Sequence, residues 1–325
     1  MSDRLSDYDF HLPDDLIASR PPDRRDASRM LVLDRATGVI SHQRFTDFPG
    51  YLRDGDLVVL NNSRVIRARM FSEDHRVELL FLEEVAPRRW KCLVKPGRRM
   101  RIGATIRAGG VNLTVVSIEE PTGERIVEAD GYIDFARHGE LPIPPYMHRE
   151  ADTQDDARYQ TVFAKPEGSV AAPTAGLHFT PELLATIPHA FLTLHVGLGT
   201  FQPVKTENLA DHTMHEERYE ISEGAAATIN SARRIVAVGT TSTRVLESQP
   251  PGAITPRAGR TSIFIRPPCE FQRIGALLTN FHLPKSTLLM LVSAFAGRER
   301  VLAAYEEAIR ERYRFFSYGD CMLIL

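Results

Sequence analysis

The sequence predicts an α/β protein in which a small antiparallel β-barrel or sandwich is inserted into one α/β domain. Outside the middle of the chain, apolar strand patterns run into loops rich in Gly, Thr or Asn, and several of these loops precede helix patterns. Between Val77 and Asp130, short apolar runs alternate with Pro-Gly, Gly-Gly and Thr-Gly turns, without a helix pattern. Because 325 residues exceed what one core usually serves, we expect two domains, residues 1–62 with 148–325 and an inserted domain, 63–147.

The expected elements follow in chain order. Met30–Asp34 and Asp56–Leu60 are apolar strand candidates, and the second ends in an Asn-Asn-Ser turn. The Pro-rich segment at Leu141 marks the return to the α/β domain, because successive prolines continue neither a helix nor a central strand. Three later runs are also expected to be strands: Phe191–Val196, Arg234–Val238 and Leu277–Thr279.

Helix signals are clearest in the second half of the chain. Thr180, Pro181 and Glu182 combine a hydroxyl cap, a proline in the first turn and an acid at the positive end of the helix dipole. Gly297 is expected to separate two consecutive helices. The expected helices are Pro181–Ile187, Thr287–Ala296 and Arg298–Tyr313.

Composition indicates a soluble, folded protein of the cytoplasm, and we expect a monomer. Hydrophobic residues make up 43% and charged residues 25% of the chain. The apolar run Leu288–Ala296 is shorter than the roughly 20 residues that cross a bilayer, and the charged N-terminal segment does not resemble a secretory signal. Cys92, Cys269 and Cys321 form no CxxC pair.

Histidines in polar loops are the candidate catalytic groups. His178 and His195 lie in the small-residue loops PTAGLHF and LHVGLGTF, and His212 and His215 lie in HTMHEE. Small residues let a ligand approach the backbone closely, and imidazoles titrate near neutral pH. A metal site built from these histidines is a weaker alternative, because their spacing does not specify a coordination geometry.

The turn from Gly239 to Arg244, GTTSTR, follows an expected strand and precedes a helix pattern. Free N–H groups and hydroxyls there suit an anion, a carboxylate or ribose hydroxyls, although a capped helix start without a ligand explains it equally well. The chain has neither a Walker A motif nor a GxGxxG motif after a strand, which argues against nucleoside-triphosphate and dinucleotide binding.

A local excess of positive charge marks the β-rich segment. The chain carries 40 basic and 42 acidic residues, but Arg64–Arg107 holds twelve Lys or Arg and five Asp or Glu. A solvated basic face and a surface for phosphate backbones both explain this excess. The cations considered for nucleic-acid binding are Arg64, Arg67, Lys95, Arg98 and Arg99.

Ordered segments along nearly the whole chain resemble the family of S-adenosylmethionine:tRNA ribosyltransferase-isomerases of queuosine biosynthesis. They include GDLVVLNNSRVIRARM, LVKPGRRM, SVAAPTAGLHFT, LHVGLGTF, HTMHEE, GTTSTRVLES, LLTNFHLPKSTLLMLVSAFAG and YRFFSYGDCMLI. The resemblance implies a barrel-like α/β main domain with an inserted small antiparallel β-barrel. The stretch between His178 and His195 looks shorter than the family pattern, so a local difference in helix length is expected there.

The resemblance also implies a reaction. The ribosyl part of S-adenosylmethionine would be transferred to, and isomerised on, the aminomethyl group of 7-aminomethyl-7-deazaguanine at the tRNA wobble position, giving epoxyqueuosine, adenine and methionine. S-adenosylmethionine would be a consumed cosubstrate, with no permanent cofactor, no metal and no membrane partner.

Residue chemistry, rather than the resemblance, gives our role assignments. A base is needed for the ribose carbon beside the sulfonium, and an acid for the departing adenine. We expect the acid–base set to be His178, His195, His215 and Glu216, with His282 near the nucleobase. The residues expected to hold S-adenosylmethionine are Thr174, Gly176, Gly199, Thr200, Gly239, Thr240, Thr241, Arg244 and Asp320.

Two alternatives from other classes stay open at this point. A metal-dependent hydrolase built on His195, His212 and His215 predicts stoichiometric zinc and sensitivity to chelators. A non-catalytic RNA-binding protein predicts that the cations matter whereas the histidine loops do not.

Overall fold

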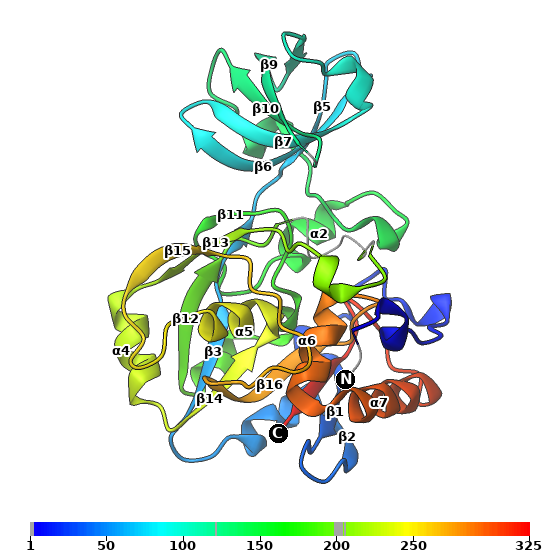
Figure 1. The fold of residues 1–325 in the computed structure, drawn as a ribbon, viewed down its shortest axis with the longest axis vertical. Coiled ribbons are helices and arrows are strands. Elements are labelled where there is room, and N and C mark those ends of the chain that lie inside the picture. The colour runs from blue at the N-terminus through cyan, green and yellow to red at the C-terminus, as the bar shows by residue number, and fades with distance from the viewer. Residues whose placement is uncertain (1–2, 121, 198–203, 205) are drawn as a thin grey trace.

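The chain forms two large sheets joined by a short connecting region. The computed structural model describes residues 3–120, 122–197, 204 and 206–325. In Figure 1 a nine-stranded sheet occupies the lower part of the molecule and a six-stranded sheet the upper part. Between them lies a small parallel pair, β4 (Arg64–Val65) and β11 (Glu167–Ser169).

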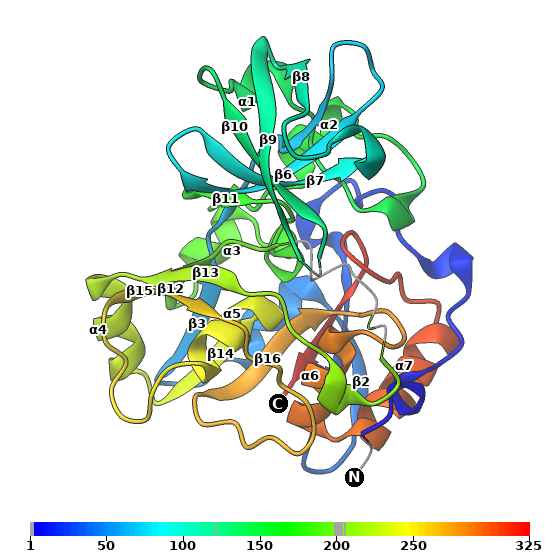
Figure 2. The same ribbon diagram turned by 45° about the horizontal axis from the view of Figure 1, so that its top comes forward.

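The large sheet is mixed, with a parallel centre. From one edge to the other its strands are β15 (Arg257–Thr261), β13 (Glu217–Ile221), β12 (His189–Leu194), β3 (Asp56–Asn61), β14 (Arg234–Val238), β16 (Ile274–Asn280), β17 (Cys321–Ile324), β1 (Arg29–Leu33) and β2 (Ile40–Arg44). The neighbours β12, β3, β14 and β16 run parallel, whereas β13 and β15 add an antiparallel edge (Figure 2).

This architecture confirms the α/β class and corrects one detail of the expected form. Among the described strands, β15 and β2 end the order and do not pair with each other, so the main sheet is open and not barrel-like. The expected strands of this sheet were found within a few residues of their predicted bounds, and β14 covers Arg234–Val238 as expected.

Both faces of the sheet are buried, because alternate side chains of each central strand enter different cores. In β3, Leu57 and Val59 pack in one core and Val58 and Leu60 in the other. The first core is formed with the helices α4 (Glu223–Ser231), α5 (Gly239–Glu247), α6 (Thr287–Ala296) and α7 (Arg298–Arg310) (Figure 1). The second contains Phe45, Phe179 and Leu184, the last from α3 (Pro181–Ala185).

Helix boundaries follow the predicted signals. Thr180 caps α3 by accepting a hydrogen bond from Leu183 N–H, and α6 begins after the Ser286 cap. Gly297 separates α6 from α7 with φ of 87°, a left-handed conformation that glycine adopts without steric cost. None of the helices formed by the described residues has the length and apolar character needed to span a bilayer.

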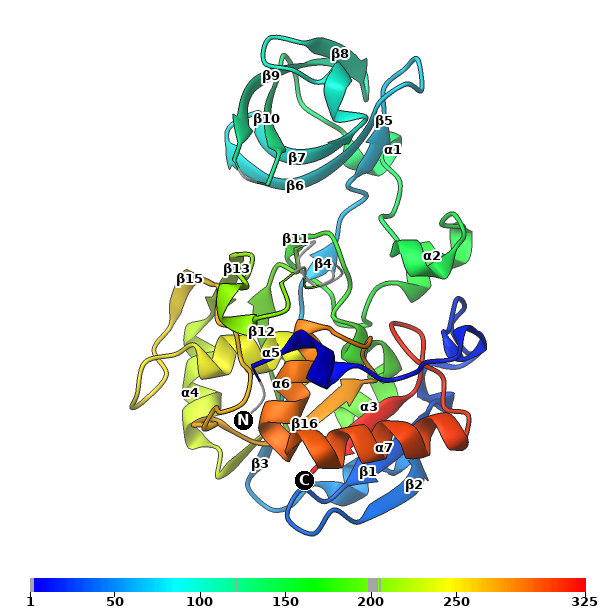
Figure 3. The ribbon, with the colours of Figure 1, turned by 45° about the vertical axis from the view of Figure 1, so that its right-hand side comes forward.

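The six-stranded sheet is antiparallel throughout and nearly closed. Its order is β5 (Arg69–Phe71), β6 (Glu78–Ala86), β7 (Arg89–Lys95), β10 (Glu124–Ala129), β9 (Val111–Glu119) and β8 (Thr105–Ala108). Glu73 N–H, just after β5, donates to Arg107 O on β8 at 2.9 Å, which brings the two ends of the sheet together (Figure 3). The predicted barrel-like β-rich segment is confirmed, while the domain boundaries 63–147 stay a prediction.

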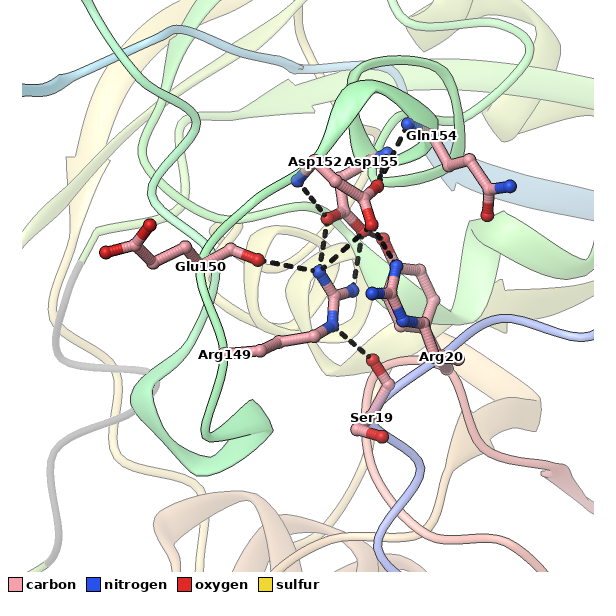
Figure 4. A network of polar contacts seen from close by, with 8 residues as sticks. Ser19, Arg20, Arg149, Glu150, Asp152, Gln154 and Asp155 are labelled. Atoms are coloured by element: carbon pink, nitrogen blue, oxygen red, sulfur yellow. Dashed lines mark hydrogen bonds and ion pairs between the residues drawn. The ribbon is translucent and has the colours of Figure 1, made fainter.

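The chain returns to the main sheet through α1 (Phe135–His138) and α2 (Thr153–Arg158), and a buried ion pair fixes this return. Asp155 accepts two hydrogen bonds from the Arg149 guanidinium, at 2.5 and 2.8 Å. It also accepts from Asp152 N–H at 2.9 Å (Figure 4). A further hydrogen bond comes from Tyr318 O–H at 2.8 Å. The network therefore ties the return connection to the loop before β17.

Candidate active site

A pocket opens at the carboxyl ends of β14 and β16. This is the edge of a parallel α/β sheet where ligands usually bind. Gly239, Thr240 and Thr241 enter it from the start of α5, and His282 from the loop after β16. Thr174 joins them from the 3-10 turn Thr174–His178. Five of the predicted site residues thus line a single pocket.

Aromatic side chains form a wall that the sequence reasoning missed. Tyr146, Phe281 and Phe316 line the pocket, and the rings of Tyr146 and Phe316 lie with centroids 4.4 Å apart. Tyr146 O–H and Ser317 Oγ are hydrogen-bonded. The sequence signal is present in LPIPPY and YRFFSYGD, but the prolines of the first indicate only a junction between domains.

Among the described residues that line the pocket, His282 is the one histidine. Its Nε2 lies 2.9 Å from Thr279 Oγ1, and its backbone N–H donates to Tyr305 O–H at 3.0 Å. Burial lowers the pKa of His282 to about 3, because the charged form loses its hydration. The imidazole is therefore neutral at neutral pH.

His178 lies behind the pocket wall and does not line it. Asn280, which does line the pocket, donates through its amide N–H groups to the backbone oxygens of Phe316 and Ser317. Its Oδ1 must then accept from His178 Nε2 at 3.0 Å, so His178 Nδ1 accepts from Ser28 O–H at 2.9 Å. Both imidazole nitrogens are engaged, and this arrangement supports a positioning role through Asn280.

His195 directly follows β12, which lies two strands from β14 in the same sheet. Its Nδ1 lies 2.9 Å from Ser63 Oγ, which lies 2.6 Å from Ser169 Oγ. Ser169 Oγ in turn accepts from Val196 N–H at 2.9 Å. Burial, together with the nearby positive charge of Arg218, lowers the pKa of His195 to about 4. Val196 lines the pocket, so His195 borders it without forming its wall.

His215 and Glu216 do not line the described pocket. Glu216 is exposed and pairs with Arg260 at 3.3 Å, and Arg260 also pairs with Glu83 of the six-stranded sheet. His212 packs against the ring of Phe264, and burial followed by repulsion from His215 lowers its pKa. Within the described part of the chain, no three His, Cys, Asp or Glu side chains are grouped in a way that would hold a metal ion.

Three predicted S-adenosylmethionine contacts lie outside the described pocket wall. Arg244 forms a buried ion pair with Glu217, and Glu217 also accepts from Gly197 N–H at 2.9 Å. Asp320 accepts backbone N–H groups of Arg29 and Arg314, both at 2.8 Å.

Gly176 meets a packing requirement, since a Cβ there would lie 2.9 Å from Thr161 Cγ2 and from Phe163 Cζ. Gly199 and Thr200 lie outside the described residues.

The predicted RNA-binding cations occupy two regions. Arg64 pairs with Glu167 at 3.6 Å, and Arg67 with Asp156 at 2.5 Å, both near the connection between the two sheets. Lys95 ends β7, and Arg98 and Arg99 lie in the exposed turn after it. Among the described residues, none of these last three forms an ion pair within 4 Å.

Buried neutral histidines predict a specific loss of stability in acid. In the unfolded chain a histidine protonates near pH 6.5, whereas burial lowers the pKa of His178 to about 4. Between these values the unfolded state binds more protons, so the free energy of unfolding should fall by ~1.4 kcal/mol per pH unit for this group as pH decreases. Urea unfolding at pH 7, 6 and 5 measures the slope. H178Q should make it shallower, whereas replacing the exposed His11 by Gln should leave it unchanged; equal slopes would contradict this account.

Comparisons with known proteins agree on one family. Residues 5–324 match the family described as "Queuosine biosynthesis protein". A curated relative from Carboxydothermus hydrogenoformans, S-adenosylmethionine:tRNA ribosyltransferase-isomerase, is 51% identical over 340 residues, covering 99% of this chain and 100% of the relative. The crystal structure of S-adenosylmethionine tRNA ribosyltransferase from Thermotoga maritima is 37% identical, with a TM-score of 0.57, covering 98% of this chain and 100% of that chain.

Proposed function

The chain belongs to the queuosine biosynthesis protein family of S-adenosylmethionine:tRNA ribosyltransferase-isomerases, and from this premise we propose its substrates, products and site. It transfers the ribosyl part of S-adenosylmethionine to the aminomethyl group of 7-aminomethyl-7-deazaguanine at the tRNA wobble position. Epoxyqueuosine in tRNA, adenine and methionine are the products. S-adenosylmethionine is consumed, and the reaction needs no permanent cofactor.

The pocket at the ends of β14 and β16 is the proposed S-adenosylmethionine site. The observation that carries this assignment is the meeting of Thr174, Gly239, Thr240 and Thr241 with an aromatic wall in one pocket. Aromatic rings suit a nucleobase, which stacks on them. The neutral imidazole of His282 lies in the same wall and is the proposed proton-exchanging group.

The proposed chemistry separates the ribosyl group from both adenine and methionine. The sulfonium acidifies the neighbouring ribose carbon, a base removes its proton, adenine leaves with a proton, and methionine leaves with the electron pair of its bond to the ribose. The electron pair of the broken C–H bond closes the carbocycle at the carbon that adenine leaves, and the ribose ring oxygen forms the epoxide as it displaces methionine. The neutral amine bonds to the carbon that this oxygen leaves and gives up a proton. His195 and Asn280 border the same region, with His178 orienting Asn280.

The direct test uses the whole chain, S-adenosylmethionine and tRNA that carries the deazaguanine precursor. Mass analysis of the nucleosides after digestion should reveal epoxyqueuosine, with adenine and methionine released in equal amounts. If the tRNA stays unmodified while S-adenosylmethionine binds, the proposed reaction is wrong. Turnover that depends on zinc would instead favour a metal-dependent hydrolase.

The six-stranded sheet is the proposed tRNA-contacting part, because its exposed turn carries Arg98 and Arg99. Reversing both charges with R98E and R99E should weaken tRNA binding. It should also make the slope of log affinity against log salt concentration shallower, by up to about the contribution of two phosphate contacts. Filter binding at several salt concentrations measures both effects, and calorimetry should find unchanged affinity for S-adenosylmethionine.

A matched control reverses two exposed charges at the far end of the molecule. Arg310, in α7, and Arg312, just beyond it, each pair with an acid on the surface. R310E with R312E changes the net charge equally, so a comparable loss of tRNA binding would attribute the effect to overall charge. If R98E with R99E weakened the binding of tRNA and of S-adenosylmethionine equally, the result would instead indicate a folding defect.

A further inference from the structure

The start of α5 differs from an ordinary helix start because no side chain caps it. Val238 is at the cap position without a side-chain hydrogen bond, and the first turn contains no acidic residue. The first N–H groups of a helix have no partner inside the helix, and they carry partial positive charge. A buried helix end of this kind calls for a partner from outside the helix.

A second observation at the same position points to a ligand. Thr241 is 8% exposed and lines the pocket, and its Oγ1 is buried without a hydrogen-bond partner among the described residues. A Cβ on Gly239 would lie 3.5 Å from Thr241 Oγ1 and 3.5 Å from Ala175 Cβ. Glycine therefore leaves open a space between two pocket-lining residues, beside an unpaired hydroxyl.

The lack of charged side chains in the pocket wall indicates which chemical group of a ligand would bind at the start of α5. Its described residues include no Asp, Glu, Lys or Arg. An anion there would meet no opposing acid, and the helix start supplies the positive potential that arginine or lysine supplies elsewhere. Arg244, which we expected to contact S-adenosylmethionine, pairs through Nη1 with buried Glu217 and does not line the pocket.

We propose that the start of α5 binds the carboxylate of the methionyl part of S-adenosylmethionine. This orientation rests on the proposed function, and the carboxylate is the only anionic group of that molecule. Backbone N–H groups of the first turn and Thr241 O–H donate to it. The adenosyl part then extends toward the aromatic wall of Tyr146, Phe281 and Phe316.

The test compares S-adenosylmethionine with decarboxylated S-adenosylmethionine, which keeps the sulfonium and the adenosine. Calorimetry with the whole chain should find the carboxylated ligand bound about 10- to 100-fold more tightly. T241V, which keeps the shape of the side chain, should reduce this preference about 10-fold by weakening only the carboxylated ligand. T241S, which keeps the hydroxyl, should retain the preference.

Ser242 supplies the matched control. It lies in the same turn, and its hydroxyl is also buried without a partner among the described residues, but it does not line the pocket. S242A should bind both ligands as the unchanged chain does. Equal affinities of the unchanged chain for both ligands, or equal weakening of both by T241V, overturn the orientation alone. A chain that binds neither ligand overturns the proposed function, and the orientation with it.

Discussion

Replacing His282 by alanine is expected to lower turnover by about 10²- to 10⁴-fold, the range typical for loss of a general acid or base. His282 lies in the pocket wall, and burial lowers its pKa to about 3, so it is in the proton-accepting form at neutral pH. If Nε2–H donates to Thr279, Nδ1 is left to accept a proton; among the described residues it has no hydrogen-bond partner. Single-turnover nucleoside analysis measures the loss, while calorimetry should find S-adenosylmethionine still bound.

The comparison that decides the assignment uses the other predicted acid–base residues. His215 and Glu216 lie outside the pocket, so H215A and E216Q should each reduce turnover much less than H282A does. Near-normal turnover of H282A with a large loss in H215A would return the role to the HTMHEE loop. The pH profile gives an independent check, because burial lowers the pKa of His282 to about 3 and a limb near pH 6.5 would indicate another group.

Local patterns were sufficient to predict most of the main sheet and the last two helices. The apolar run of β14 and the break at Gly297 depend on strand propensity and on glycine's conformational freedom, which act within a few residues. The position of β17 could not be predicted in the same way. It lies between β16 and β1 and pairs with residues nearly 300 positions away, and no short segment encodes such a pairing.

The candidate site shows the same division between local and long-range information. Loops after parallel strands meet at one edge of a sheet. Thr174, Gly239 and His282, which the sequence predicts to belong to one site, line one pocket. The sequence could not show which polar side chains already have hydrogen-bond partners within the protein. His178 is engaged by Asn280, 102 residues away, and Asp320 by backbone N–H groups on two segments. Residue chemistry alone therefore does not show which polar side chains line the pocket.

Replacing Asp155 by alanine is expected to destabilise the fold by about 3–5 kcal/mol. The Asp155 side chain is 1% exposed and accepts two hydrogen bonds from the Arg149 guanidinium. Its removal leaves Tyr318 O–H and Asp152 N–H without their acceptor in a buried region. Burial raises the pKa of Asp155, but the hydrogen bonds from Arg149, Asp152 N–H and Tyr318 outweigh burial and hold the pKa below its ordinary value.

The neighbouring Asp156 provides a control for the loss of stability expected in D155A. It belongs to the same short helix, α2, and its ion pair with Arg67 is exposed, so D156A should cost less than about 1 kcal/mol. Because the pKa of Asp155 is lowered in the folded state, its contribution is complete above the unfolded pKa near 3.8 and is lost as pH falls through the folded value. Urea unfolding of D155A, D156A and the unchanged chain should therefore give a large gap for D155A at pH 7 that narrows in strong acid. Equal costs for the two variants would show that the network in Figure 4 contributes no more than a surface pair.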